Sequence, residues 1–469
     1  MITTDPKTRL DASEVAHFLA RAVDANGSRP AANGGASLDD VITDLAKLGL
    51  PPGGVVILAL SNGVHLVTQY FAALLLGLVP LAISPAIPSA RITELARHLG
   101  AHALVAARLD PARYSTRTAY RVGSGRAVLL PGQDGTAYQP GEVLMLTSGT
   151  SGMFSACVHH VDSLLRNARR HAESVGLRAE DVLLVNLPLY YSYAIVAQAF
   201  AAAVSGARLV VSGPPFAPAS YRSAISAHGV TSSSVTPMIA RMLLAQGEPL
   251  PPTLRMLTVG GDRIAPEQVS GLLSLNPKGE LYITYGLTEA GPRVATLAAH
   301  QEHGRRHSSV GLPLTGVRTS LRGKEAAEGE LLVASDTVLL RKVGAIAPHA
   351  RKTIVGPGVI ATGDIFRIDG DGYLYFRGRL SDFVVVRGEK VSLLSVRQAA
   401  HAIPGVLRCI PRVEIAEDGT THVDLEVYVA DLDGDTEQRI RRVLNSFLLP
   451  SERPRRIVVG AADPTVFQK

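Results

Sequence analysis

The chain has 469 residues, 46% of them hydrophobic, so it can bury a large core and form more than one domain. Its 47 Lys and Arg residues only slightly outnumber its 41 Asp and Glu residues. No aromatic residues interleave the short basic clusters, which argues against nucleic-acid binding. Two cysteines, Cys157 and Cys409, exclude a disulfide framework and predict a reducing, cytoplasmic environment. The N-terminus lacks a signal-peptide pattern, and the most apolar stretch, residues 70–83, contains Pro80 and is too short to span a membrane. We therefore expect a soluble protein.

Strand-like and helix-like patterns alternate in the N-terminal part of the chain. The predicted strands are 55–60, 79–83 and 103–106, and the predicted helices between them are 65–76 and 91–98. This order predicts an α/β fold in which mostly parallel sheets are covered by helices on both faces.

A hydroxyl-rich loop follows the apolar run at residues 143–146, which predicts a buried strand. The loop reads Thr147-Ser148-Gly149-Thr150-Ser151-Gly152. Glycine lets the backbone turn its N–H groups toward one point, and the hydroxyl groups add donors there. Such a nest of donors fits the phosphates of a nucleotide, and the alternative is an ordinary Ser/Thr/Gly surface loop.

Tyrosines and glycines follow later predicted strands. Tyr190, Tyr191 and Tyr193 stand at the end of one such strand, where they form either a pocket wall or simple packing. Glycines end the predicted strands at 257–262 and 281–286. Ligands bind beyond the strand ends of open α/β sheets, so these glycines would let a ligand approach the backbone.

A hydroxyl stands next to a carboxylate in Thr288-Glu289, directly after the second of these strands. One carboxylate is enough to hold a Mg²⁺ that phosphate and water otherwise coordinate. Taken alone, Glu289 is better explained as a solvated surface acid.

The last quarter of the chain differs in pattern. Residues 363–376 alternate around an Asp-Gly turn and predict a β-hairpin. Helix and strand patterns then alternate in a small α+β unit. The best boundary lies at residues 380–382, which divides the chain into a large domain, 1–380, and a small C-terminal domain, 381–469.

Five segments in this order and spacing resemble the adenylate-forming superfamily of acyl-CoA synthetases, peptide-synthetase adenylation domains and luciferases. They are residues 147–152, 285–289, 309–313, 362–364 and 378–379. The resemblance covers nearly the whole chain. It implies an enzyme that uses ATP and Mg²⁺, with a large N-terminal domain and a small, mobile C-terminal one.

The resemblance also implies roles for individual residues. The loop Thr147 to Gly152 would hold the β- and γ-phosphates of ATP, and Glu289 would bind Mg²⁺. Asp364 would accept hydrogen bonds from the ribose hydroxyls, as an ionised acid can. The other implied nucleotide-binding residues are Gly260, Gly261, Asp262, Tyr285, Gly286, Thr288 and Arg379. The implied acid-binding residues are Tyr190, Tyr191, Tyr193, Gly286 and Gly291.

Members of this superfamily rotate the small domain between two half-reactions, acyl-adenylate formation and attack by a thiol. Ser381 takes the hinge position in this chain, and the rotation would bring Arg387 to the acyl adenylate. Lys469 takes the place of a catalytic lysine near the C-terminus, although Gln468 replaces the preceding glycine of the family pattern. A lysine there offers a mobile charge to the carboxylate and the α-phosphate. The alternative is a frayed terminal lysine.

The chain departs from the family pattern directly after the phosphate loop. Where the family has Pro-Lys-Gly, this chain has Phe154-Ser155-Ala156, so the lysine that helps neutralise pyrophosphate is missing. A charge-assisted contact of this kind contributes about 1.5–3 kcal/mol, so its loss would slow turnover unless another cation substitutes. His159, His160 and Arg166 stand nearby in the sequence as candidates for that cation, although a structural role is the better explanation of each.

The function predicted from the sequence is activation of an organic acid as an acyl adenylate. The acyl group would pass to a thiol of coenzyme A or of a carrier protein's phosphopantetheine. Tyr191 stands where coenzyme A ligases often have histidine and amino-acid-activating domains aspartate, which argues against an ordinary amino acid. The tyrosines at 190, 191 and 193 suit an aromatic or unsaturated acid. Two alternatives stay open: a non-thiol acceptor, with an unusual acid such as nitrite included, and a non-catalytic nucleotide binder.

Overall fold

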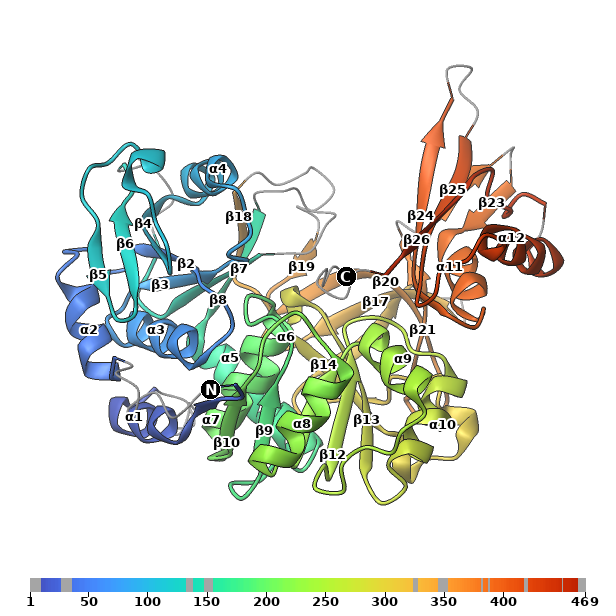
Figure 1. Ribbon diagram of the computed structural model, residues 1–469, viewed down its shortest axis with the longest axis horizontal. Coiled ribbons are helices and arrows are strands. Elements are labelled where there is room, and N and C mark those ends of the chain that lie inside the picture. Colours follow the sequence, from blue (N-terminus) through green and yellow to red (C-terminus); the bar gives the residue numbers. More distant parts are fainter. Residues whose placement is uncertain are drawn as a thin grey trace.

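Figure 1 shows the computed structural model, a large region followed by a C-terminal part that stands to one side. The residues that the structure describes are 10–26, 36–131, 138–146, 155–323, 328–344, 353–380, 383–386, 389–416, 421–448 and 450–462. No helix within these ranges is long and apolar enough to cross a membrane.

The first sheet of the large region has five strands in the order β3-β2-β4-β6-β5, with β3, β2 and β4 parallel and β6 and β5 antiparallel. Its strands are β2 Val55–Ala59, β3 Val79–Ala82, β4 Ala101–Ala106, β5 Tyr120–Val122 and β6 Gly125–Leu129, and its helices are α2 Leu38–Ala46, α3 Val64–Leu75 and α4 Ser89–Leu99. Val56 and Leu58 point into the core that includes α3, whereas Val55 and Ile57 point into the core that includes α4. This confirms the predicted arrangement of helices on both faces.

The second sheet has eight strands in the order β1-β10-β9-β11-β12-β13-β14-β15. It is parallel from β1 to β13, and β14 and β15 are antiparallel. The strands are β1 Val23–Asp24, β9 Val182–Val185, β10 Arg208–Val211, β11 Ser232–Val235, β12 Met256–Gly260, β13 Glu280–Gly286, β14 Arg293–Ala298 and β15 Leu312–Pro313. The helices packed along it are α1 Ala12–Arg21, α5 Val161–Ser174, α6 Ser192–Ala194, the π-helix η3 Ile195–Phe200, α7 Ala201–Ser205, α8 Pro218–His228, α9 Pro237–Gln246 and α10 Pro266–Leu275.

Antiparallel strands complete the large region. One sheet of three strands has the order β18-β8-β7, and a sheet of five contains the predicted hairpin at residues 363–376 as β20 and β21. The strands are β7 Glu142–Leu146, β8 Ser155–His160, β16 Arg318–Arg322, β17 Glu328–Ala334, β18 Arg341–Gly344, β19 Ile354–Gly356, β20 Val359–Ile368 and β21 Leu374–Arg379. Short 3₁₀ turns are η2 Pro111–Tyr114, η4 Thr288–Ala290, η5 Ala299–Gln301 and η6 Gly304–Arg306. The sequence did not predict β8, whose partner β18 comes from far downstream in the chain.

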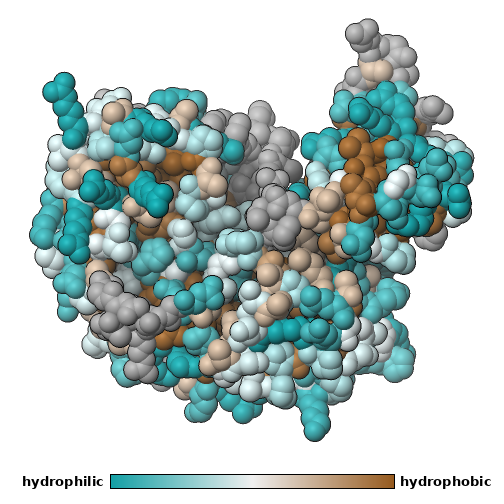
Figure 2. All heavy atoms as spheres, viewed as in Figure 1, coloured by the Kyte–Doolittle hydropathy of each residue, from teal (hydrophilic) through white to brown (hydrophobic). Residues whose placement is uncertain are grey.

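The C-terminal part has a core of its own (Figure 1). Its elements are β22 Phe383–Val386, β23 Glu389–Ser392, α11 Leu393–His401, β24 Val406–Ile415, β25 Thr421–Val429, α12 Thr436–Phe447 and β26 Ile457–Ala461. Alternate residues of β25, including Val423 and Val427, are buried with residues of α11 and α12. Figure 2 shows mostly hydrophilic side chains on the face seen, with a narrow apolar strip on this part.

Candidate active site

Three of the predicted nucleotide-binding residues meet where β13 approaches the β20–β21 hairpin. Asp364 and Arg379 lie opposite each other on the paired strands, and Arg379 Nε is 3.0 Å from Asp364 Oδ1. The Tyr285 hydroxyl donates to Asp364 Oδ2 at 2.7 Å. Burial, together with the charge of Asp364, holds the pKa of the Tyr285 phenol well above its usual value. The Asp364 carboxylate is only 3% exposed, and its remaining lone pairs can still accept hydrogen bonds from hydroxyl groups.

Thr288 begins the turn η4 and is held from two sides. Its hydroxyl lies 3.1 Å from that of Ser192, the residue directly after Tyr191. Its carbonyl oxygen lies 2.9 Å from Nε2 of His159 on β8. Burial lowers the pKa of His159 to about 4, so the ring is neutral at pH 7 and acts as a donor from Nε2. These contacts fix the backbone that carries Glu289.

Glu289 forms an ion pair that the sequence did not predict. Its Oε1 lies 2.9 Å from Nζ of Lys342 on β18, and the two side chains are 16% and 8% exposed. The carbonyl of Glu289 also accepts from the backbone N–H of Leu339, so two contacts join this turn to the segment leading into β18. Lys342 lies opposite Cys157 on β8, the strand that begins directly after residues 147–154. A lysine thus reaches the site from β18, the strand paired with β8, which follows the predicted phosphate loop in the sequence.

The three cation candidates named from the sequence have structural contacts instead. His159 is neutral, as shown above. His160 accepts a hydrogen bond from the backbone N–H of Asp162 at the start of α5. Arg166 pairs with Asp336 at 3.1 Å, which Arg170 also binds at 2.6 Å. Each of the three therefore fits a structural role better than that of a cation for the pyrophosphate. The cation that lies beside Glu289 is Lys342.

The predicted tyrosines separate into two groups. Tyr190 and Tyr191 are half-buried and pack against each other, with ring centroids 4.7 Å apart. Tyr193 is buried and turns inward, where its hydroxyl lies 3.2 Å from that of Thr258 on β12. The guanidinium of Arg293 lies over the Tyr193 ring, 4.0 Å from its centroid. Tyr193 therefore reaches the carboxyl ends of β12 and β13.

The predicted glycines at these strand ends have close neighbours. A Cβ at Gly286 would lie 2.2 Å from the carbonyl oxygen of Pro292. At Gly291, where φ is +97°, a Cβ would lie 2.3 Å from the carbonyl oxygen of Thr337. Backbone packing alone thus requires glycine at both positions, and their predicted contact with the acid stays a prediction. Gly261 and Asp262 are exposed just beyond β12, and Asp262 accepts from the backbone N–H of Arg263.

Several predicted residues lie outside the described part of the chain. They are Thr147, Ser148, Gly149, Thr150, Ser151 and Gly152 of the phosphate loop, the hinge residue Ser381, and the catalytic candidates Arg387 and Lys469. Their roles stay predictions.

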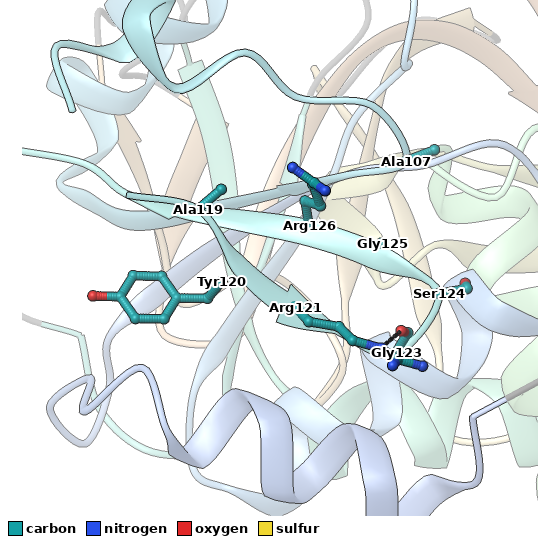
Figure 3. A pocket seen from close by; sticks show the side chains of 8 residues that line it. All are labelled: Ala107, Ala119, Tyr120, Arg121, Gly123, Ser124, Gly125 and Arg126. Carbon is teal, nitrogen blue, oxygen red and sulfur yellow. Dashed lines mark hydrogen bonds between the residues drawn. The ribbon is translucent and has the colours of Figure 1, made fainter. Parts of the chain in front are cut away.

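Two surface hollows lie apart from these residues. The one in Figure 3, of about 430 Å³, surrounds the β5–β6 turn, where Arg121 donates from Nε to the carbonyl of Gly123. The second, of about 690 Å³, lies beyond the carboxyl ends of β2 and β4. None of the predicted site residues lines either hollow, so we assign the site from the contacts above.

The side chains around Glu289 fit a magnesium ion that is coordinated mainly by the phosphates of a bound nucleotide. No group of three or more His, Cys, Asp or Glu side chains within the described ranges is arranged to hold a metal. A protein cage is therefore absent from that part of the chain. Mg²⁺ bound to nucleotide phosphates needs only one or two carboxylates from the protein, and Glu289 supplies one.

Comparison with known proteins identifies the family of the chain. The sequence profile of the AMP-binding enzyme family matches residues 41–341. A long-chain-fatty-acid–CoA ligase of Mycobacterium tuberculosis is 25% identical over 444 residues, covering 90% of this chain and 87% of that protein. A salicylyl-CoA synthase / salicylate adenylyltransferase of Streptomyces is 27% identical over 417 residues, covering 79% and 74%.

Solved structures share the fold. An o-succinylbenzoate CoA synthetase from Bacillus subtilis, in complex with its acyl-adenylate intermediate, superimposes with a TM-score of 0.74 at 19% identity, covering 91% of this chain and 88% of that one. An amide bond synthetase from Marinactinospora thermotolerans gives 0.73 at 21% identity, covering 96% and 95%.

The fold and the sequence relatives define an adenylate-forming ligase. The chain belongs to the AMP-binding enzyme family.

Proposed function

We propose that this ligase uses ATP and Mg²⁺ to convert an organic acid into an acyl adenylate and then transfers the acyl group to a thiol. The observation that carries the proposal is the meeting of two polar clusters beside β13. One is formed by Tyr285, Asp364 and Arg379, and the other by Thr288, Glu289 and Lys342. The first suits a ribose and its phosphate, and the second suits the phosphates and their cation.

In the first step, a carboxylate oxygen of the acid bonds to the α-phosphorus of ATP while the bond to pyrophosphate breaks. The Thr288 hydroxyl, positioned by Ser192, donates to the α-phosphate. Negative charge increases on these oxygens, and fixed donors and cations stabilise it without reorganising. Lys469 would supply a further mobile charge to the carboxylate and the α-phosphate. Mg²⁺ held by Glu289 would neutralise the leaving pyrophosphate.

Lys342 takes over, in this proposal, the role of the lysine missing from the phosphate loop. It stands on the strand next to β8, and β8 directly follows that loop. When ATP and Mg²⁺ bind, the ammonium moves from Glu289 to a phosphate oxygen, and the carboxylate becomes free for the metal. Before the nucleotide binds, the Lys342–Glu289 ion pair therefore neutralises both side chains.

The acid is proposed to be aromatic or unsaturated. The half-buried pair Tyr190 and Tyr191 offers ring surface for it, and aromatic pairs of this kind contribute about 0.5–1.5 kcal/mol beyond area burial. Two curated relatives, from Streptomyces and Mycobacterium tuberculosis, are named for salicylate.

The second step requires the small domain to move, with residues 1–380 and 381–469 as the two bodies and Ser381 as the hinge. The pose described here is held by Arg241 on α9, whose Nε and Nη2 donate to the carbonyl of Leu407 at 3.0 and 2.6 Å. Rotation would break these bonds and bring Arg387 to the acyl adenylate. The acceptor is coenzyme A or a carrier protein's phosphopantetheine.

The proposal is tested by screening acids for pyrophosphate release and identifying the products by mass spectrometry. We expect acid-dependent AMP and pyrophosphate, with a large loss in Lys469→Ala. Adding coenzyme A, a phosphopantetheinylated carrier protein or an amine then identifies the acceptor by which one is consumed. Consumption of the amine alone supports the non-thiol alternative. Nucleotide binding without turnover of any acid supports the non-catalytic one.

A further inference from the structure

Arg293 is a buried cation without an acidic partner in the described part of the chain. It begins β14, is 3% exposed, and enters none of the ion pairs formed there. Its Nη1 donates to the Thr284 hydroxyl at 2.6 Å, and its guanidinium covers the Tyr193 ring. Its Nε has no hydrogen-bond partner among the residues that the structure describes. Buried charges are normally paired, because an uncompensated one is costly.

The groups around Arg293 are polar but neutral. The Tyr193 hydroxyl, the Thr258 hydroxyl and the Ser234 hydroxyl form a chain at 3.2 and 2.8 Å. His171, on α5, is fully buried, and burial, with a further contribution from the charge of Arg293, lowers its pKa to about 3, so it carries no charge at pH 7. The cluster therefore presents hydrogen-bond donors and one positive charge.

The guanidinium lies next to the strand end where the acid is proposed to bind. A Cβ added at Gly260 would lie 2.4 Å from the Thr284 hydroxyl and 3.2 Å from Nη1 of Arg293. Gly261 faces the Tyr193 ring, 3.7 Å from the position its own Cβ would take. Close packing therefore requires glycine at position 260, and it brings the guanidinium of Arg293 against the end of β12.

Arg293 lies opposite Gly286 on β13, and its side chain reaches back to the Thr284 hydroxyl. Thr284 precedes Gly286 by two residues, a distance of roughly 6–7 Å along a strand. Thr288 and Glu289 follow Gly286 in the chain, so the guanidinium and the predicted phosphate-binding residues extend from Gly286 in different directions. A small acid with its reacting carboxyl group near Thr288 would point its far end toward Arg293.

We propose that Arg293 binds a second anionic group of the acid, a carboxylate at the end remote from the carboxyl group that is activated. A carboxylate there accepts from Nε and a neighbouring guanidinium nitrogen in the two-pronged geometry that arginine favours. The enzyme's substrate is then a dicarboxylic acid that carries an aromatic or unsaturated spacer. This inference rests on the proposed function, which supplies the reaction and the location of the acid.

The test compares dicarboxylic acids with their monoamides, which keep size and shape but lose one charge. We expect the wild-type enzyme to prefer the dicarboxylate by at least about 10-fold in kcat/KM, measured by pyrophosphate release. Arg293→Met should remove that preference and Arg293→Lys should keep part of it. Arg222→Met removes another mostly buried arginine, bound to the carbonyls of Glu248 and Pro249, and should leave the preference unchanged.

Isothermal titration calorimetry of the same pairs, without ATP, separates this inference from the proposed function. Tighter binding of the dicarboxylate to the wild type, lost in Arg293→Met, supports Arg293 even if no acid is turned over. Equal kcat/KM and equal affinity for dicarboxylate and monoamide in the wild type overturn the inference. That comparison needs no variant, so a misfolded Arg293→Met leaves the test intact.

Discussion

Replacing Lys342 with methionine removes its charge and keeps most of its apolar stem. The ammonium is 2.9 Å from Glu289, and the two side chains are 8% and 16% exposed, so little solvent screens the pair. Removing one partner of a buried pair costs about 3–5 kcal/mol, because the other charge is left unpaired. Since Glu289 keeps some exposure, we expect a loss of about 3 kcal/mol in the free energy of unfolding. The double variant Lys342→Met/Glu289→Gln should recover much of that loss.

The same substitution should weaken the interaction with ATP. A charge-assisted phosphate contact contributes about 1.5–3 kcal/mol, which corresponds to about 10–150-fold in kcat/KM for ATP. Lys342→Arg should keep part of the activity, because it keeps the charge and changes the geometry.

The assay measures pyrophosphate release at saturating acid while ATP is varied, with urea unfolding followed in parallel. Lys47→Met is the matched control, since Lys47 pairs with Asp44 on the surface and is 65% exposed. That control should change kcat/KM for ATP by less than about twofold, because an exposed pair contributes only about 0–1 kcal/mol. A folded Lys342→Met enzyme that retains wild-type kcat/KM for ATP would refute the role given to Lys342.

Three further predictions follow from the contacts. Asp364→Ala leaves Tyr285 and Arg379 without their shared acceptor, and we expect the affinity for ATP, measured by calorimetry, to fall at least about 10-fold. The pKa of His159 is about 4 in the folded protein against 6.5 as its ordinary value, so the unfolded chain binds a proton between these values and stability falls as pH falls through them. Between pH 7 and pH 5, His159 should lower the free energy of unfolding, measured in urea, by about 2 kcal/mol. His159→Gln should remove this part of the pH dependence. The same pH dependence in the variant and the wild type would contradict the prediction. Arg241→Ala breaks the bonds to Leu407, and stopped-flow rates should show the adenylation and transfer steps changing by different factors, whereas equal changes would argue against a pose-specific contact.

Local pattern was sufficient for much of the fold. Strands such as β2 and β9 are short apolar runs bounded by turn residues, and the β20–β21 hairpin is marked by its Asp-Gly turn. The sequence did not predict β8, because it contains two histidines and one of its two partners is β18, a strand distant in the chain. Register between distant strands depends on tertiary packing, which a local pattern does not contain.

In the candidate site, too, local motifs predicted some residues, and others depend on the pairing of distant strands. The motifs indicated Thr288, Glu289, Asp364 and Arg379, and the structure brings each of them beside β13 or its neighbouring hairpin. Lys342 was missed because it stands in no motif and reaches Glu289 only through the pairing of β18 with β8. One signal was available: Arg341 and Lys342 are neighbours in a strand-like run, so their side chains point to opposite faces and one of the two cations turns inward, where it needs a partner.

Arg293 and Lys342 are two buried cations near opposite ends of the segment from Thr284 to Glu289. Lys342 has a protein carboxylate as its partner, so it can exchange that partner for a phosphate when Glu289 takes up a metal ion. Among the described residues, the Arg293 guanidinium contacts a hydroxyl and an aromatic ring, and neither neutralises its charge. An arginine cannot lose its proton to escape this cost, whereas a buried lysine can. A bound anion would neutralise Arg293, and in our proposal that anion is the remote carboxylate of the acid.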